Sequence, residues 1–375
     1  MATNPPFSNS YIVTNRLYPY TFLPDSTAYV VPLPPGELYF STTNAPYDQT
    51  PDDYSYVTKS GDKFMSQLQA DLEKTVDANG QANLAVYIHG LGNTYDDAIT
   101  GTAALGSALF GSGYTGLVIG FSWPSYSDLV APLASYYATS RPPQSTSGTI
   151  RDNINGSTGS FVTLIQALLA LQVNSQAVNL NIISHSEGNF MLVLGMEALS
   201  QAGVTSGISN AILLAADISA VLLQQGQWGD ALTGICGAVT VYYSGADADL
   251  CYSNYEFFAY HDQTYPTRLG LVGPYGYPAA TTIPSSVTGI DCSLVTVNLG
   301  SPLNVHSSYL SLPQILADMS AVLSATAPAG RVQFPGTTLP SYYLSPTASQ
   351  AAGFSVHQGI FRRRQGERSL NRYGR

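Results

Sequence analysis

The sequence predicts an α/β fold in which a mostly parallel central sheet carries helices on both faces. Two observations support this prediction. From residue 84 onward, short apolar segments alternate with longer segments of helical periodicity, which is the pattern of a parallel sheet with crossover helices. The short segments are nearly continuous in apolar residues, as expected for strands that are buried on both faces.

The individual elements follow from the apolar periodicity. Strands are predicted over residues 84–88, 117–121, 180–183, 211–215, 238–243 and 290–297. Helices are predicted between them over residues 94–110, 159–173, 189–201 and 219–224, and after them over residues 313–323. A further helix is predicted over residues 62–76, where Phe64, Leu68, Leu72 and Val76 lie about one turn apart and Gly80 follows as a stop signal.

The two ends of the chain depart from this alternation. Residues 1–80 form an N-terminal extension that is rich in Pro and Tyr. We expect extended pieces at 28–31 and 37–41 to form edge strands or an irregular wrap, because proline does not fit a central strand. After the main domain, residues 81–326, the pattern fades into Pro, Gly, Ser and Thr. Residues 327–375 are therefore expected to have little regular structure and a disordered basic end.

Two long insertions interrupt the main domain, at residues 124–157 and 252–284. Both follow predicted strands, and in open α/β sheets ligands bind at the carboxyl ends of the strands. Both are rich in Tyr, which is unusual on a free surface loop. We predict that they form walls or a lid of a substrate site, with two floppy surface loops as the alternative.

The charge distribution argues against a polyanionic partner. Only 10% of the residues are charged, and the net charge is −10. Residues 361–375 hold six Arg and one Glu, so this tail carries +5 and the rest of the chain carries −15. An acidic body argues against nucleic acid as the main partner. A neutral, Tyr-rich surface suits apolar or uncharged ligands.

Redox chemistry, metal binding and membrane insertion receive little support. Cys236, Cys251 and Cys292 are too few for a disulfide framework; one bridge with a free thiol and three buried thiols both remain open. No Cys/His cluster has metal-ligand spacing. No secretory signal is visible, and the longest apolar runs fall short of the ~20 residues that span a bilayer. The protein is expected to be soluble, either cytoplasmic or secreted by a non-classical route.

A candidate nucleophile lies where an apolar strand passes directly into an apolar helix. The corner reads Ser184-His185-Ser186-Glu187-Gly188. In a nucleophile elbow the serine sits on a sharp strand-to-helix turn, and its neighbours two positions away must be small because two backbones pass closely there. Ser184 and Gly188 satisfy this requirement, although glycine is usual at the first position. The alternative is a Ser/His-rich turn that caps the helix.

A serine nucleophile needs a histidine base and an acid that orients it, in the chain order Ser, Asp/Glu, His. The strand predicted at 238–243 is followed by Asp247, our first choice for the acid, and by Asp249, the second. Asp217 is the third choice. Each of the three also suits a turn or a helix cap.

Two histidines follow the nucleophile. His306 lies between the last predicted strand and the last helix, where the base is expected. His261 lies inside the second insertion and is the weaker choice.

An oxyanion hole needs two backbone N–H donors. We predict the N–H of Glu187, directly after the nucleophile, and the N–H of Leu91, in the glycine-containing loop His89-Gly90-Leu91-Gly92-Asn93. His89 is interpreted as a structural residue that holds this loop.

Together these segments resemble an α/β-hydrolase family long catalogued as of unknown function. The resemblance covers about residues 82–323. Its motifs are His89-Gly90-Leu91-Gly92-Asn93, Phe121-Ser122-Trp123-Pro124-Ser125, His185-Ser186-Glu187-Gly188-Asn189, Leu214-Ala215-Ala216-Asp217, Ser244-Gly245-Ala246-Asp247, Arg268-Leu269-Gly270, Asp291 and His306-Ser307-Ser308-Tyr309. Each motif alone is weak, but eight in the same order are specific.

The resemblance implies the α/β-hydrolase fold, with Ser186 as nucleophile, Asp247 as acid and His306 as base. One departure is Glu187, which stands where the family usually has Met. Its carboxylate would either repel an oxyanion and slow the reaction, or form a hydrogen bond elsewhere without effect. Residues near the motifs are candidates for substrate binding: His89, Trp123, Tyr126 and His185.

From these observations we predict a serine hydrolase that cleaves carboxylic esters, a carboxylesterase or lipase acting on a small uncharged or apolar ester. No cofactor, metal, nucleic acid or stable membrane insertion is expected, and the oligomeric state is left open. The alternatives are a peptidase or amidase, an acyltransferase that uses the same triad, and a non-enzymatic binding protein on a hydrolase scaffold.

Overall fold

The structure is a computed structural model. It describes residues 10–16, 34, 36–43, 57–58, 61–77, 80–125, 150–253, 268–276, 283–296, 299, 304–335 and 337–345. Several predictions fall outside these residues, namely the extended piece at 28–31, Tyr126, His261, most of the two insertions and the basic tail. Within the described part of the chain, no helix has the length and hydropathy needed to cross a bilayer.

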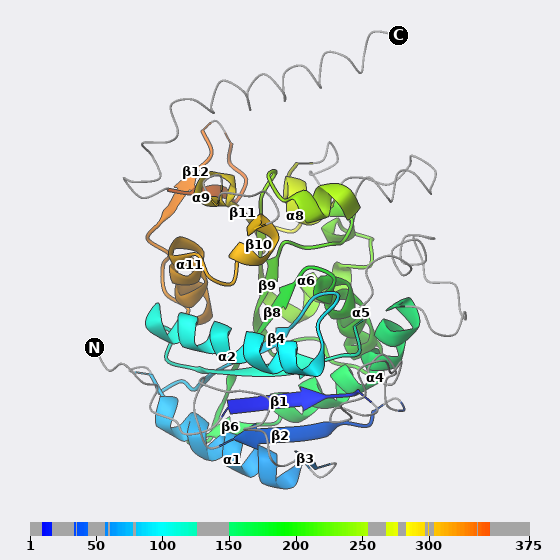
Figure 1. Ribbon diagram of the computed structural model, residues 1–375. Helices are drawn as coiled ribbons and strands as arrows, with labels where there is room; N and C mark the ends of the chain where they lie inside the picture. Colours follow the sequence, from blue (N-terminus) through cyan, green and yellow to red (C-terminus); the bar gives the residue numbers. More distant parts are fainter. Residues whose placement is uncertain are drawn as a thin grey trace.

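A single large sheet organises the described residues. Its strands lie in the order β12-β13-β11-β10-β9-β8-β4-β5-β1-β2-β3, which Figure 1 shows from top to bottom. The bounds are β1 Ser10–Thr14, β2 Tyr39–Thr43, β3 Val57–Thr58, β4 Asn83–Ile88, β5 Leu117–Ser122, β8 Asn179–His185, β9 Ile208–Leu214, β10 Cys236–Tyr243, β11 Val287–Asp291, β12 Arg331–Gln333 and β13 Ser341–Leu344. Two short strands, β6 Gln172–Val173 and β7 Gln176–Ala177, form a separate hairpin.

The sheet is mostly parallel, as predicted. Every pair from β1 across to β13 is parallel. Antiparallel pairs occur only near the two edges, between β1, β2 and β3 and between β12 and β13. The carboxyl ends of β4, β8, β10 and β11 therefore meet at one edge of the sheet, which is where the motif residues follow.

Helices cover both faces of this sheet (Figure 1). Successive side chains of a strand point to opposite faces, so Leu84, Val86 and Ile88 enter one apolar core while Ala85 and Tyr87 enter the other. The first core is closed by helices α1 Asp62–Leu72, α4 Ile150–Leu169, α5 Gly188–Gln201 and α6 Asp230–Ile235. The second is closed by α2 Tyr95–Gly111, α9 Ser293–Thr296, α10 Val305–Ser308 and α11 Pro313–Leu323.

Element boundaries agree with the sequence except at a few places. The last predicted strand, 290–297, is wrong in position, because β11 ends at Asp291 and its carboxylate accepts a hydrogen bond from the Ser293 N–H at the start of α9. The segment predicted as a helix at 219–224 is the short 3-10 helix η4, Ala220–Leu223. Helix α4 begins at Ile150, so it includes the last residues of the predicted insertion 124–157.

The N-terminal extension contributes more than edge strands. Strand β1 is buried throughout and pairs with β5 on one side and with β2 on the other. The piece predicted at 37–41 corresponds to β2, which pairs with both β1 and β3, so the prediction of an edge strand or irregular wrap is wrong there. The strand at residues 10–14 is absent from the sequence prediction. The short sequence Ser-Tyr-Ile-Val-Thr has strong β propensity, but the many prolines around it obscured this signal.

The expectation of little structure after residue 327 is wrong for residues 331–344. There β12 and β13 form a hairpin that extends the sheet beside β11. A partly buried ion pair joins the hairpin to α11, since the Arg331 guanidinium donates two hydrogen bonds of 2.8 Å to the Asp318 carboxylate. The Tyr242 hydroxyl donates a third bond to Asp318, at 2.6 Å. The anchoring carboxylate lies 13 residues before the arginine, so a local sequence window did not reveal it.

Candidate active site

The strand-to-helix corner at Ser186 has the backbone of a nucleophile elbow. Ser186 lies between β8 and α5 with a φ of 55°, in the left-handed region that side-chain-bearing residues rarely adopt. The turn is fixed by main-chain hydrogen bonds from the Ser186 N–H to Leu214 and from the Asp217 N–H to Ser186, of 3.0 and 3.2 Å. Backbone strain of this kind is typical of functional sites.

Two glycines allow this corner to form. A Cβ at Gly188 would lie 2.6 Å from the carbonyl oxygen of His89, and one at Gly90 would lie 2.8 Å from the Ser186 Cβ. Such separations are shorter than van der Waals contact, so only glycine fits at either position. The loop after β4 therefore packs directly against the serine.

Three side chains that lie far apart in sequence form one hydrogen-bonded chain. The Oγ of Ser186 is 2.9 Å from Nε2 of His306. The Nδ1 of His306 is 2.9 and 3.1 Å from the two carboxylate oxygens of Asp247. They follow β8, β10 and β11, whose carboxyl ends lie at the same edge of the sheet. Because Nδ1–H can only donate to a carboxylate, Nε2 is the nitrogen that faces the serine as an acceptor.

The surroundings favour a basic imidazole at His306. Burial opposes its charged form, but the hydrogen bond to Asp247 and the charges of Asp247, Asp249 and Asp217 outweigh burial and raise the pKa of His306 above its ordinary value. A raised pKa makes the imidazole a stronger proton acceptor for the serine hydroxyl.

The other two candidate acids have different surroundings. Asp249 is exposed and influences His306 through its charge. Asp217 forms an ion pair of 2.9 Å with Arg268 and accepts a 2.7 Å hydrogen bond from Ser253. Asp247 is thus the carboxylate that hydrogen-bonds His306.

The loop after β4 is held by its carbonyl oxygens. The Trp123 indole donates to the His89 carbonyl at 2.9 Å. The His89 ring, through Nδ1, and the Asn93 side chain both donate to the Gly90 carbonyl, at 2.9 and 3.2 Å. The Asn93 side chain also donates to the Leu91 carbonyl at 3.1 Å. In a trans peptide the N–H points opposite to the carbonyl of the same peptide, so the Leu91 N–H points away from the His89 and Asn93 side chains that hold the Gly90 carbonyl.

The backbone N–H groups of both predicted oxyanion donors lack a described hydrogen-bond acceptor. Among the residues that the structure describes, no backbone or side-chain acceptor pairs with the N–H of Leu91 or of Glu187. Glu187 directly precedes α5, where the helix dipole favours negative charge.

The residues predicted to bind substrate have supporting contacts. Trp123 is fully buried and stacks on the His89 ring with centroids 5.6 Å apart. The His185 ring, through Nε2, donates a 2.7 Å hydrogen bond to the His306 carbonyl. Burial and the neighbouring His306 lower the pKa of His185 to about 4, which keeps this donor neutral. His89 and Trp123 are 1% and 0% exposed, and contact of either side chain with substrate stays a prediction.

Glu187 is the least expected group at the site. Its side chain is 1% exposed, and neither carboxylate oxygen has a hydrogen-bond partner among the described residues. Burial and the charge of Asp217 raise the pKa of Glu187 well above its ordinary value, although Arg268 acts in the opposite direction. The environment thus favours the uncharged acid, so neither of the two effects expected from its sequence position, oxyanion repulsion or a hydrogen bond elsewhere, is supported.

Replacing Glu187 with Gln is expected to stabilise the fold increasingly as the pH rises. Because the folded-state pKa is raised, the folded protein takes up a proton that the unfolded chain has lost above the ordinary value of 4.5. Wild-type stability should therefore fall from pH 4.5 upward through this titration, and Glu187→Gln should not show that fall. Thermal unfolding from pH 4.5 to 8 measures the difference.

Glu197→Gln, on the same helix, is the control for the loss of a glutamate. We expect the Glu187→Gln advantage to be on the order of 1–3 kcal/mol near pH 8. Parallel pH dependences for wild type and Glu187→Gln would contradict this account of the buried acid.

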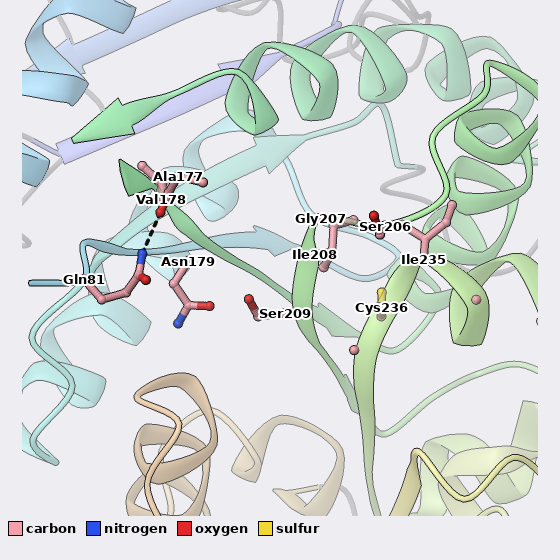
Figure 2. A pocket seen from close by; sticks show the side chains of 12 residues that line it. Gln81, Ala177, Val178, Asn179, Ser206, Gly207, Ile208, Ser209, Ile235 and Cys236 are labelled. Atoms are coloured by element: carbon pink, nitrogen blue, oxygen red, sulfur yellow. Dashed lines mark hydrogen bonds between the residues drawn. The ribbon is translucent and has the colours of Figure 1, made fainter. Parts of the chain in front are cut away.

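Two other features of the described residues add no chemistry. Asp247, Asp249 and His306 have possible ligand atoms within 4.8 Å of one another, and two of them, Asp247 and His306, are hydrogen-bonded to each other. A cavity of about 420 Å³ lies at the amino ends of β8, β9 and β10, lined by Asn179, Ile208 and Cys236 among others (Figure 2). This is the opposite edge from Ser186. Burial raises the pKa of the Cys236 thiol to about 12, and no charged side chain is among the described residues that line this cavity.

All three cysteines are thiols that form no disulfide. Cys236 and Cys292 are buried, whereas Cys251 is exposed. Neither of the two alternatives left open by the sequence holds in full, because no bridge forms and Cys251 is exposed.

A parallel sheet with helices on both faces and a strained serine at its carboxyl edge defines the α/β hydrolases. A family model described as "Alpha/beta hydrolase of unknown function (DUF900)" matches residues 65–324. This match covers more than half of the chain, so the protein belongs to that family, as its motifs indicated. A search of the curated proteins gives no match.

Several solved structures are similar at low identity. A lipase B from Aspergillus fumigatus has 15% identity and a TM-score of 0.33, over 67% of this chain and 54% of that one. A hormone-sensitive lipase from a metagenome library has 11% identity and a TM-score of 0.35, over 71% and 93% of the two chains. An esterase from Rhizomucor miehei has 12% identity and a TM-score of 0.35, over 65% and 74%. This chain thus spans about half the length of the first of these proteins.

Two contributors to the site were missed by the sequence reading. The Asn189 side chain donates a 2.9 Å hydrogen bond to the Ser186 carbonyl and so braces the elbow from the first turn of α5. Its place in the His-Ser-x-Gly-Asn motif was the available signal. The second is Arg16, which follows β1 and contacts the loop after β4. It lies outside the residues that the family model matches.

Proposed function

We propose that this protein is a serine hydrolase that cleaves carboxylic esters through an acyl-enzyme intermediate. The observation that carries the proposal is the hydrogen-bonded chain from Asp247 through His306 to Ser186, placed on a strained elbow. The low charge and many tyrosines of the sequence support a small uncharged or apolar ester as the substrate.

The first half of the reaction forms the acyl-enzyme. The Ser186 Oγ attacks the ester carbonyl carbon while its proton passes to Nε2 of His306. The negative charge that develops on the carbonyl oxygen is stabilised by the N–H groups of Leu91 and Glu187 and by the amino end of α5. Asp247 stabilises the imidazolium. When the tetrahedral intermediate collapses, the bond to the alcohol oxygen breaks and His306 returns the proton to that oxygen.

The second half releases the acid. A water molecule attacks the acyl carbon, its proton passes to His306, and the bond to Ser186 Oγ breaks as the proton returns to the serine. Free enzyme and a carboxylic acid result, so atoms and charge balance with no further reactant. An uncharged Glu187 beside Ser186 is compatible with this step because it adds no negative charge next to the oxyanion.

A labelling experiment tests the proposal directly. A fluorophosphonate probe is expected to modify the wild-type protein, with the adduct mapped to Ser186 by peptide mass spectrometry. A series of p-nitrophenyl esters from acetate to decanoate is expected to be hydrolysed, with an initial burst that matches the number of labelled sites. Absence of both labelling and turnover would instead favour a non-enzymatic binding protein.

The same assay separates the remaining alternatives. Matched p-nitroanilides should react much more slowly than the esters, and faster anilide turnover would indicate an amidase or peptidase. With an added alcohol, the free acid should remain the main product, and a predominant transfer product would indicate an acyltransferase.

A further inference from the structure

A buried arginine from the N-terminal strand contacts the loop that carries the predicted oxyanion donor. Arg16 directly follows β1 at the carboxyl edge of the sheet and is 0% exposed. Its Nε donates to the Ser122 Oγ at 2.9 Å, and its Nη2 donates to the Asn93 carbonyl at 2.7 Å. The same Nη2 lies 3.5 Å from Nε2 of His89. The guanidinium thus bridges the end of β5 and the loop after β4.

The contact with His89 has a defined direction. Because Nδ1 of His89 hydrogen-bonds the Gly90 carbonyl, which only accepts, Nδ1 carries the proton and Nε2 is an acceptor toward Arg16. Burial and the positive charge of Arg16 lower the pKa of His89 to about 3. The ring therefore stays neutral, and it can hold the Gly90 carbonyl and face the guanidinium at once.

Arg16 and its partners fix the loop at both of its ends. At the Asn93 end, the carbonyl accepts from Arg16 and from the Ser125 hydroxyl, the latter at 2.8 Å. At the Gly90 end, the carbonyl accepts from His89 and from the Asn93 side chain. The peptide whose Gly90 carbonyl is held in this way also carries the Leu91 N–H, and Gly90 packs against the Ser186 Cβ. A shift of this loop would move the N–H relative to the serine.

A fully buried charge is costly unless its donors are hydrogen-bonded. Buried ionisable groups with shifted pKa values are more common at functional sites than elsewhere. Burial lowers the pKa of Arg16 to about 9, although the charges of Tyr95, Asp97 and Asp96 favour the charged form. The guanidinium therefore remains charged at neutral pH. A planar fork is needed to reach Ser122 and Asn93 together, which a single ammonium group does not provide.

We propose that Arg16 is a positioning residue of the active site, whose guanidinium orients the Gly90–Leu91 peptide so that the Leu91 N–H faces the oxyanion formed at Ser186. This proposal rests on the hydrolase function proposed above. It adds the N-terminal strand, which lies outside the family match, to the parts of the chain that the reaction requires.

The test compares Arg16→Met and Arg16→Lys with wild type on a p-nitrophenyl ester. We expect kcat to fall about 10- to 100-fold in Arg16→Met, with KM changed less than threefold, because oxyanion stabilisation acts in the transition state. Arg16→Lys should recover only part of the loss, since its ammonium keeps the charge without the fork. A trifluoromethyl ketone, which binds as a tetrahedral oxyanion, should lose affinity in parallel with kcat.

Tyr11→Phe is the control for a loosened β1. It removes a buried 2.8 Å hydrogen bond from the same strand to Asp71, away from the loop. We expect it to lower the melting temperature and leave kcat and the trifluoromethyl ketone affinity unchanged. Should Arg16→Met fail to fold, Arg16→Lys and Ser122→Ala carry the test, because Ser122→Ala removes only the acceptor of Nε.

The outcomes separate the two proposals. Suppose that the wild-type protein turns over esters and reacts with the fluorophosphonate, and that the Arg16 variants keep its kcat and its affinity for the ketone. This result would overturn only the positioning role. The positioning role would also be overturned if the Arg16 variants had a lower melting temperature and unchanged kcat, as expected for Tyr11→Phe. A wild-type protein that neither turns over esters nor reacts with the fluorophosphonate overturns the hydrolase function, and the role of Arg16 with it.

Discussion

Ser186→Ala is expected to lower kcat for p-nitrophenyl esters by roughly four to six orders of magnitude. The methyl group has no oxygen to form the acyl-enzyme, so the reaction would depend on direct attack by water. KM should change little, because the hydroxyl contributes little to binding of the ground state. Fluorophosphonate labelling should disappear, and steady-state kinetics with titrated active sites measure the loss.

Ser184→Ala is a closely matched control for this experiment. Ser184 lies two residues earlier, in β8. It is fully buried, and its Oγ has no hydrogen-bond partner among the described residues. Removing an unpaired buried hydroxyl should not lower stability, and kcat should stay within about twofold of wild type, as for a substitution that touches no reacting group. Equal activity in Ser186→Ala and Ser184→Ala would exclude Ser186 as the nucleophile.

Asp247→Asn is expected to lower kcat/KM by about four orders of magnitude near pH 7.5. The side chain is fully buried and accepts from Nδ1 of His306 and from the Leu250 N–H. Asparagine can keep the bond to Leu250 with its oxygen while its amide donates to His306. The imidazole then carries its proton on Nε2, where it can no longer accept the proton of Ser186.

The pH profile gives this substitution a second signature. The imidazole of His306 must be neutral to accept a proton, so kcat/KM rises with pH through its pKa. Because that pKa is raised, the wild-type inflection should lie above 6.5. In Asp247→Asn, His306 no longer donates a hydrogen bond to a carboxylate and no longer has that negative charge beside it. The pKa of His306 therefore falls, and the residual activity should inflect at lower pH.

Asp249→Asn is the control that separates charge from contact. Asp249 is exposed and acts on His306 only through its charge. We expect activity near pH 8 to stay within a fewfold of wild type, with the inflection shifted slightly to lower pH. A large loss of kcat in Asp249→Asn, with a small one in Asp247→Asn, would reverse the assignment of the acid.

Much of the candidate site was predictable because it follows the order of strands in a parallel sheet. Ser186, Asp247 and His306 each follow a strand with a clear apolar pattern, and the carboxyl ends of parallel strands meet at one edge. Chain order therefore predicted which side chains lie together. The choice between Asp247 and Asp249 needed the structure. The two residues lie almost equally far along the chain after β10, and only the structure shows which carboxylate contacts His306.

The residues that brace the site were harder to predict. Arg16 comes from a segment of many prolines, and its contacts with Ser122 and Asn93 span 106 and 77 residues. The hairpin at 331–344 likewise depends on Asp318, a carboxylate on another element. In both cases polar contacts with distant residues hold a segment that lies in a part of the chain rich in Pro, Ser and Thr.

The sequence by itself determined the layered α/β architecture and a short list of side chains for the proposed chemistry, because apolar periodicity and chain order are properties of the chain alone. Tertiary structure alone decided the neutral state favoured at Glu187, the supporting contacts of His89 and Trp123, and the contact of Arg16 with the loop after β4. Burial and charge at a side chain depend on everything packed around it, and those neighbours come from distant parts of the chain.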